Sequence, residues 1–226
     1  MKCSNMTEQT VRYANVNVAI LCESSGKVRE AFRKRGHNAW SFDLLPADDE
    51  SPFHIQGDVQ QTFKQPQPVQ SKKFPQWNHE RKWDLVIAHP PCTYLTTSGA
   101  RWLYEDRPSQ TREERWQGLI DGALFFKWCL ELDVPKVAVE NPIMLKYARK
   151  IVGAEPTQYI QPWQFGHGET KKTGLWLRGL PELRPTNIVE GREQRLHNLP
   201  PSEDRWKIRS ETYQGIASAM ADQWGK

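Results

Sequence analysis

Short apolar segments alternate with helical segments along this chain of 226 residues, and this alternation constrains the fold most strongly. Strands are expected where the sequence is short, apolar and rich in β-branched or aromatic residues, at 16–22, 38–42, 83–88 and 134–139. Apolar residues at helical spacing predict helices at 27–35, 113–132, 145–152 and 211–223. Alternating strands and helices predict an α/β fold, a mainly parallel sheet with helices on both faces.

Several segments fall outside this simple alternation. A strand end or turn is expected at 57–59, a loop at 93–110, and further short strands at 158–161 and 174–177. Residues 60–82 predict a Gln/Pro/Lys-rich surface insertion, because spaced prolines disfavour a helix or a central strand. Residues 178–209 are Pro- and Arg-rich and are expected to be mostly irregular. With residues 1–15 as a flexible lead, one domain is expected over 1–226.

Composition excludes several classes of protein. Ten Trp, eight Phe and six Tyr are too much aromatic mass for a disordered chain. No run of about 18 apolar residues and no apolar leader stand in the sequence, so no membrane span or secretory signal is expected. The four Cys form no CxxC pair, which argues against a zinc site or a disulfide framework and favours a reducing cytoplasm. A net charge of +4 permits a nucleic-acid partner without requiring one.

A cysteine and a glutamate follow the ends of two strands that are consecutive along the chain. Pro90 and Pro91 stiffen the backbone before Cys92, and Glu140 follows the strand at 134–139. Parallel strand ends would bring the two side chains together as a nucleophile and an acid, since a carboxyl group in a partly dry pocket can hold its proton. Taken singly, Cys92 is also typical of a packed thiol and Glu140 of a helix cap.

The first strand, turn and helix predict a cofactor cleft. Ser25 and Gly26 in the turn let the backbone approach a ligand closely. Asp43, at the end of the second strand, is placed to hold ribose hydroxyls, as an acidic residue does in nucleotide-binding βαβ units. Asp58 would bind an adenine amino group one strand further on. Aspartates at strand ends are also common in ordinary turns.

Together these segments resemble the DNA cytosine-C5 methyltransferase family. LCESSGKVREAFRKRGHNAWSFDLLP (21–46) and GDV (57–59) resemble its cofactor motifs, and HPPCTYLTTSG (89–99) its Pro-Cys nucleophile motif with the mobile loop that follows. VENP (139–142) resembles the Glu-Asn motif. FGHGETKKTGLWL (165–177) resembles the Gln-Arg-Arg motif, and RSETYQGIASAMADQWG (209–225) the C-terminal helix. The similarity spans most of the chain in the family's order, with small phage-encoded members as the nearest in kind.

The resemblance implies a Rossmann-like fold, S-adenosylmethionine as cofactor and DNA, double- or single-stranded, as partner. It implies no metal and no membrane, and it places the protein in the cytoplasm of a bacterial or phage-infected cell. It assigns catalysis to Cys92, Glu140 and Lys171. It assigns cofactor binding to Ser24, Ser25, Gly26, Asp43, Leu44, Asp58, Val59, Pro90 and Gln214, and substrate binding to Pro91, Thr96, Ser98, Asn141, Pro142 and Thr173.

The implied reaction is covalent. Addition of the Cys92 thiolate to C6 of cytosine activates C5 for methylation, while Glu140 contacts N3. In duplex DNA the base must first leave the stack.

The chain departs from the family pattern in four places. The glycine-rich first motif reads Glu23-Ser24-Ser25-Gly26, and the Gln-Arg-Arg motif reads Glu169, Lys171 and Thr173. The family's asparagine in the last motif falls near Gln214. Residues 178–209 stand where family members insert a target-recognition domain, so low or short sequence specificity, or a partner protein that supplies recognition, is expected.

Two other functions remain open from the sequence. Amino-methyltransferases acting on N4 of cytosine or N6 of adenine also carry Pro-Pro, but an aromatic residue follows it; here Cys92 follows, and Tyr94 comes two positions later. The second is an idle relative that binds DNA or cofactor without catalysis, as the altered motifs suggest. The substrate stays open between duplex, single strand, RNA and free nucleotide, and the transferred group between methyl and something larger.

Overall fold

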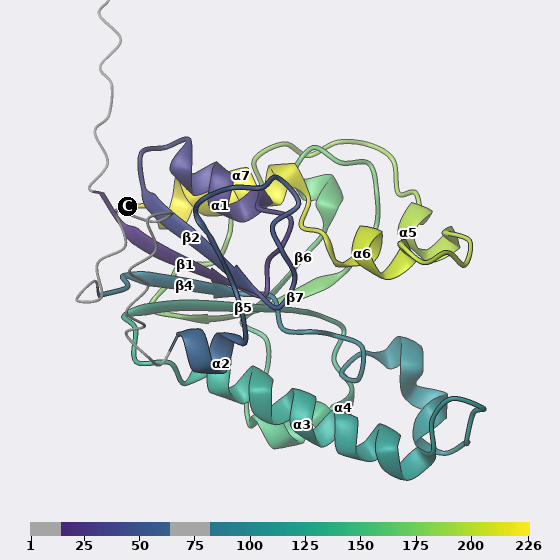
Figure 1. The fold of residues 1–226 in the computed structure, drawn as a ribbon. Helices are drawn as coiled ribbons and strands as arrows, with labels where there is room; N and C mark the ends of the chain where they lie inside the picture. Colours follow the sequence, from purple (N-terminus) through teal and green to yellow (C-terminus); the bar gives the residue numbers. More distant parts are fainter. Residues whose placement is uncertain (1–14, 64–81) are drawn as a thin grey trace, which may run out of the picture.

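The computed structural model describes residues 15–63 and 82–226 and contains a seven-stranded sheet (Figure 1). In order across the sheet, the strands are β3 (His54–Gln56), β2 (Asn38–Asp43), β1 (Asn17–Leu21), β4 (Leu85–Ala88), β5 (Lys136–Pro142), β7 (Thr173–Arg178) and β6 (Gln158–Ile160). Strands β1 to β5 pair in parallel, and β7 is antiparallel to both neighbours. The expected Rossmann-like α/β fold is confirmed, and the strand order reverses between β1 and β4, where such sheets bind ligands.

Helices cover both faces of the sheet. Helices α1 (Lys27–Arg33) and α7 (Gln214–Trp224) lie together on one face, and α2 (Val59–Thr62), α3 (Arg112–Leu130) and α4 (Lys146–Val152) lie on the other (Figure 1). Each face has its own apolar core: Phe32 and Met220 belong to the first, Leu119 and Phe126 to the second. All four residues of β4 are buried, as expected for a strand covered on both faces.

Helix α3 follows the sequence prediction in place but not in every buried position. It begins after Thr111, whose side chain accepts from Glu114 N while the Glu114 carboxylate accepts from Thr111 N, a capping box. Apolar residues such as Ile120 and Leu124 predict a broad buried face on this helix, but these two side chains are 36% and 51% exposed. The expected apolar face was too wide, because the sheet and α4 cover only part of the helix surface.

Three segments are more ordered than the sequence suggested. Strand β3 ends at Gln56, directly before the strand end or turn expected at 57–59, and Asp58 caps helix α2, which begins at Val59. The expected loop at 93–110 contains a 3₁₀ helix, η1 (Thr97–Leu103), and the expected irregular segment at 178–209 contains α5 (Arg195–Asn198) and α6 (Arg205–Ser210). A further 3₁₀ turn, η2, covers Pro162–Gln164. The C-terminal helix begins at Gln214, three residues later than expected.

Two predicted segments lie largely outside the described residues: the lead at 1–15, of which only Asn15 is described, and most of the insertion at 60–82. Within the described parts of the chain, no helix is long and apolar enough to cross a membrane.

The loop after Cys92 is held from two sides. Buried Arg115 of α3 donates from Nη2 to the Thr93 carbonyl at 2.8 Å, and its guanidinium lies 4.6 Å from the Tyr94 ring centroid. Leu95 is fully buried, and its carbonyl accepts from Leu145 N at 2.7 Å. The segment that the resemblance describes as a mobile loop is thus tied to α3 and to the start of α4.

Candidate active site

The ends of β4 and β5 place a histidine, a glutamate and a cysteine at one edge of the sheet. Ala88 pairs with Val139 in parallel register, so His89 and Glu140 follow at the same level on neighbouring strands. His89 Nδ1 donates to Glu140 Oε2 at 2.8 Å. Cys92, three residues further along, is close enough to Glu140 for their charges to interact. The expectation that strand order brings Cys92 and Glu140 together is therefore met.

The electrostatic state of Glu140 differs from the sequence expectation. Burial acts to raise the pKa of this carboxyl group, as expected for a dry pocket. The hydrogen bond from His89 and the positive charge of Lys171 outweigh burial, and the net effect lowers the pKa of Glu140 below its ordinary value. The expectation that Glu140 keeps its own proton at neutral pH is wrong, because its partners stabilise the carboxylate.

Cys92 lies half-buried in a mixed electrostatic environment. Burial raises the pKa of the Cys92 thiol, and the charge of Glu140 raises it further. Lys171 and Arg209 act in the opposite direction and lower the pKa. Because the thiolate is the reactive form, these two cations favour the nucleophile, although the net pKa stays above the ordinary value.

We expect Lys171→Met to slow alkylation of Cys92 by iodoacetamide at pH 8 by roughly three- to tenfold. Loss of the cation raises the pKa of Cys92 further, so less thiolate is present and the rate profile moves to higher pH. Peptide mass spectrometry of the alkylated Cys92 measures the rate. Lys172→Met is the matched control, because Lys172 is exposed and lies over Tyr159. Equal rates in both variants would contradict the assignment of Lys171.

The other residues predicted to bind the substrate differ in their exposure and in their hydrogen bonds within the chain. Exposed Pro91 and half-buried Pro142 flank the site. Thr96 is buried and its hydroxyl lies 2.9 Å from that of exposed Ser98. Asn141 is fully buried; its amide donates to the Pro142 carbonyl, while its Oδ1 accepts from none of the described residues. These residues lie at the edge of the sheet expected from the sequence, and their contact with a substrate stays a prediction.

Two residues of the late motif have structural partners. Thr173 is buried and donates its hydroxyl to the Lys171 carbonyl at 3.1 Å. Glu169 accepts from Tyr213 Oη and from Arg195 Nε, at 2.7 and 3.0 Å. Lys171 alone of these three interacts with Cys92 and Glu140, and its ammonium donates to the Glu211 carbonyl at 3.3 Å.

A buried carboxylate closes the N-terminus of α1. The two oxygens of Glu23 accept from Val28 N and Arg29 N, at 2.6 and 3.2 Å. Burial raises the pKa of Glu23, while the charge of His89 and these backbone donors act to lower it. The N–H groups that could otherwise bind a phosphate are thus occupied by the chain itself. Ser24 and Ser25 remain half-buried in the turn.

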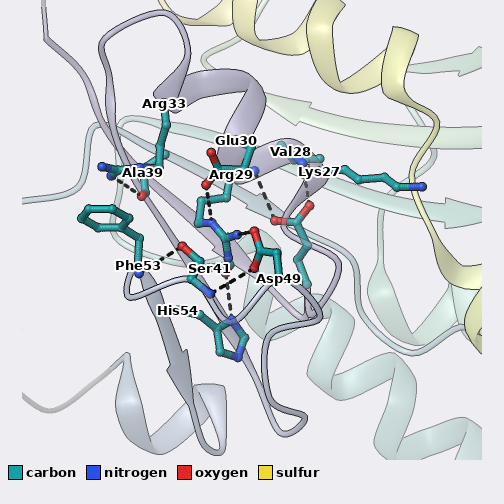
Figure 2. A network of polar contacts seen from close by, with 12 residues as sticks. Lys27, Val28, Arg29, Glu30, Arg33, Ala39, Ser41, Asp49, Phe53 and His54 are labelled. Atoms are coloured by element: carbon teal, nitrogen blue, oxygen red, sulfur yellow. Dashed lines mark hydrogen bonds and ion pairs between the residues drawn. The ribbon is translucent and has the colours of Figure 1, made fainter. Parts of the chain in front are cut away.

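Gly26 has a different role from the one expected. Its φ is +68°, and a Cβ there would stand 2.2 Å from Arg29 Nη2. That side of Gly26 is filled by the fully buried Arg29, so it leaves no room for a ligand. Figure 2 shows the Arg29 guanidinium between Ser41 and Asp49, with hydrogen bonds to Ser41 Oγ at 2.8 Å and to Asp49 Oδ2.

Asp49→Asn should destabilise the fold by about 3 kcal/mol, because it leaves the buried Arg29 charge poorly compensated. Glu30, the other carboxylate on Arg29, limits the loss. Urea unfolding followed by circular dichroism measures the change. Asp121→Asn, on the exposed side of α3, is the control and should change stability by less than about 0.5 kcal/mol. Equal stability of the two variants would show that the Arg29–Asp49 pair contributes little.

The ends of β1, β2 and β3 form the rest of the predicted cofactor cleft. Cys22 has a φ of +58°, an uncommon conformation for a residue with a side chain, and its thiol interacts with the charges of Asp43 and Asp58. Asp43 Oδ1 accepts from Leu45 N, and burial raises the pKa of Asp43. Asp58 Oδ1 accepts from Gln60 N and caps α2, which is the ordinary structural use of such a residue.

The remaining predicted cofactor residues differ in exposure. Leu44 is exposed, Val59 and Pro90 are buried, and Gln214 is exposed at the start of α7. The start of α7 packs closely against the loop that follows η2, because Gly215 N donates to His167 Nε2 at 3.0 Å. In the described residues, no group of three His, Cys, Asp or Glu side chains is arranged to hold a metal ion.

Solved structures of two methyltransferases are similar to this chain. One is described as a "putative DNA modification methyltransferase" encoded within an E. coli prophage: 15% identity, TM-score 0.46, covering 82% of this chain and 56% of that one. The other is the methyltransferase EhMeth of Entamoeba histolytica: 14% identity, TM-score 0.45, covering 84% of this chain and 61% of that one. The chain therefore spans about three-fifths of either protein. No family model and no curated protein sequence matches the chain.

Sequence reasoning missed three side chains at this site. His89 precedes the Pro-Pro-Cys segment and pairs with Glu140, and the parallel register of β4 and β5 was the signal that could have found it. Glu23 follows β1 and turns inward to cap α1. Arg209 comes from the segment expected to be irregular, and only the folding of α6 toward the strand ends brings its charge close to Cys92.

Proposed function

We propose that this protein transfers a methyl group from S-adenosylmethionine to C5 of cytosine in DNA, through a covalent bond between Cys92 and C6. The observation that carries the proposal is the meeting of Cys92, Glu140 and Lys171 at the ends of β4 and β5. A nucleophile, a carboxylate and a cation in one half-buried place are the groups that covalent addition to an aromatic ring needs.

Each residue at the site has its own role in the proposed reaction. The Cys92 thiolate adds to C6, and Lys171 and Arg209 favour that thiolate. Glu140 contacts the N3 side of the ring, which takes up a proton there as addition places negative charge on N3. C5 then takes the methyl group that S-adenosylmethionine supplies, the C5 proton leaves to a base, and elimination releases Cys92. The Pro90–Pro91 segment fixes the backbone that presents the thiol.

The cofactor cleft suits a ligand that carries no phosphate. Glu23 occupies the donors at the start of α1, where a nucleotide phosphate would otherwise bind. Glu23 and Asp58 follow the ends of β1 and β3, and Asp43 is the last residue of β2, so acidic side chains gather at this edge of the sheet and favour a cationic ligand. The sulfonium and ammonium groups of S-adenosylmethionine fit this charge, and Asp43 is the residue placed for its ribose.

DNA with little sequence preference is the substrate that the fold favours. Residues 178–209 fold back onto the preceding loop through the bridges Phe165–Asn187 and Glu169–Glu193. This segment is short and rich in proline, and on that ground we infer that it builds no separate surface of the roughly 1,000 Å² that base reading requires. Recognition then depends on a very short context, on single strands or on a partner protein, and phosphate contacts dominate affinity.

Nucleoside mass spectrometry tests the activity directly. The purified protein is incubated with plasmid DNA and S-adenosylmethionine carrying a labelled methyl group, beside Cys92→Ala. The proposal expects labelled 5-methylcytosine from the wild type alone. Labelled N4-methylcytosine or N6-methyladenine would assign an amino-methyltransferase instead. Cofactor binding without any transfer to duplex or single-stranded DNA would indicate a catalytically idle relative.

Asp43→Ala should weaken binding of S-adenosylmethionine by about ten- to a hundredfold, the cost of a lost hydrogen bond to a charged group. Isothermal titration calorimetry measures the affinity. Asp222→Ala is the control, because Asp222 is exposed and pairs with Arg35 away from the strand ends. Unchanged affinity in Asp43→Ala would remove this residue from the cofactor site.

A further inference from the structure

His89 is the member of this site to which the proposed chemistry gives no task. Its side chain is 10% exposed and that of Glu140 is 13% exposed, and the two are joined by the 2.8 Å hydrogen bond from Nδ1 to Oε2. Burial of this degree exceeds what a surface ion pair shows, and each partner has left water to form the pair. Because burying such a pair costs free energy, we look for a function of the His89–Glu140 pair at this site.

The second ring nitrogen of His89 makes no hydrogen bond within the described residues. This atom, Nε2, is buried. The charge of His89 acts on the buried carboxyl of Glu23, so the ring stands near two acidic side chains from two different strand ends. The Glu140 carboxylate compensates an imidazolium at His89, and the positive charge of His89 also acts to lower the pKa of Glu23 against the effect of burial.

The proposed addition step needs a proton that Glu140 does not hold. When a thiolate adds to C6, negative charge develops at N3 and must be neutralised there. An ionised carboxylate can orient the ring but has no proton to donate. His89 Nδ1–H already points at the Glu140 carboxylate, which makes it the nearest source of that proton.

We propose that His89 stores the proton that Glu140 passes to N3 of the substrate base, so that the two side chains act as one proton-holding pair. This inference rests on the proposed function and names the residue that supplies its acid. His89 is a positioning and proton-storing residue, since it acts through Glu140 rather than on the substrate.

The step balances in atoms and charge. Cys92 enters as a thiolate, its proton having gone to water. Its electron pair forms the S–C6 bond, and the C5–C6 double-bond electrons move into the ring. N3 takes a proton from Glu140, which receives one from His89 Nδ1. The pair thus passes from imidazolium and carboxylate to neutral imidazole and carboxylate, and it recovers the proton when Cys92 is eliminated.

The proton content of the pair depends on every charge around it. Glu23 and Glu140 face His89, and Lys171 and Cys92 face Glu140. The rate of addition should rise with pH as Cys92 ionises and fall as the pair loses its proton, which gives a bell-shaped profile.

His89→Asn tests the inference, because the asparagine amide can occupy the place of Nδ1 and donate to Glu140 without carrying a transferable proton. Adduct formation with single-stranded and duplex DNA containing 5-fluorocytosine is followed from pH 6 to 10. We expect His89→Asn to react about 10²-fold more slowly or worse near neutral pH and to lose the fall at high pH. His197→Asn, exposed on α5, is the control and should match the wild type.

A second measurement needs no catalysis. Ring-nitrogen NMR of the protein without DNA should show that Glu140→Gln changes the His89 Nδ1 resonance, because the anionic acceptor of its hydrogen bond is lost.

The outcomes separate the two proposals. A wild type that forms the adduct, with His89→Asn keeping the same bell-shaped profile, overturns the role of His89 and leaves the methyltransferase proposal standing. A His89 Nδ1 resonance that is the same in Glu140→Gln also overturns it. A wild type that forms no adduct with either DNA overturns the proposed function, and the inference with it.

Discussion

Cys92→Ala should abolish covalent trapping of 5-fluorocytosine DNA and reduce methyl transfer by about 10⁴-fold or more. Fluorine at C5 cannot leave as a cation, so the enzyme remains bonded to C6 and the adduct survives denaturing electrophoresis. Alanine removes the atom that forms this bond, and nothing else at the site supplies an equivalent nucleophile for the first step. Cys92→Ser should behave in the same way, because a hydroxyl next to Glu140 ionises far less readily than a thiol.

Cys129→Ala is the control for loss of a thiol. Cys129 is fully buried on α3, and burial raises the pKa of its thiol, so this cysteine is a packing residue. The variant should keep adduct formation while losing some stability to a small cavity. An adduct that persists in Cys92→Ala would assign the nucleophile elsewhere.

Glu140→Gln is expected to lower turnover by roughly 10²–10⁴-fold, with S-adenosylmethionine binding little changed. Glutamine keeps the shape of the side chain but removes the carboxylate that accepts from His89 and that is proposed to contact the substrate base. Single-turnover kinetics with labelled cofactor, beside calorimetry, separates the chemical step from binding. Because the pKa of Glu140 is lowered, the carboxylate is the form present in the wild type at neutral pH.

Glu155→Gln provides the comparison for this prediction. Glu155 is exposed and pairs with Arg149 at the end of α4, so its loss should leave turnover unchanged. If Glu140→Gln also turned over normally, Glu140 would be a structural partner of His89 and nothing more.

The sheet was predictable because strand signals in this chain are local. Short apolar runs such as 83–88 are read from their own residues, and the alternation with helices sets the parallel order. The meeting of Cys92 and Glu140 followed from that order alone. The helices in 178–209 were missed because α5 and α6 have four and six residues, too few for a periodic pattern to stand out.

The charge state of the site could not be derived in the same way. The sequence predicted a dry pocket for Glu140, and burial does act to raise its pKa. His89 and Lys171 reverse the outcome, and they come from different strand ends whose side chains meet only in the folded chain. The role of Gly26 could not be derived from the sequence either, because the space left by its missing side chain is filled by Arg29 rather than by a ligand.

The tethered loop after Cys92 affects how much conformational entropy is lost when a ligand binds. Arg115 and Leu95 fix one conformation of this loop before any ligand arrives. When a loop orders only on binding, few of the free molecules have the conformation that binds. The apparent affinity is then the intrinsic affinity multiplied by that fraction. Here that entropy is lost during folding, so little of the free energy of a later binding step is needed to order this segment.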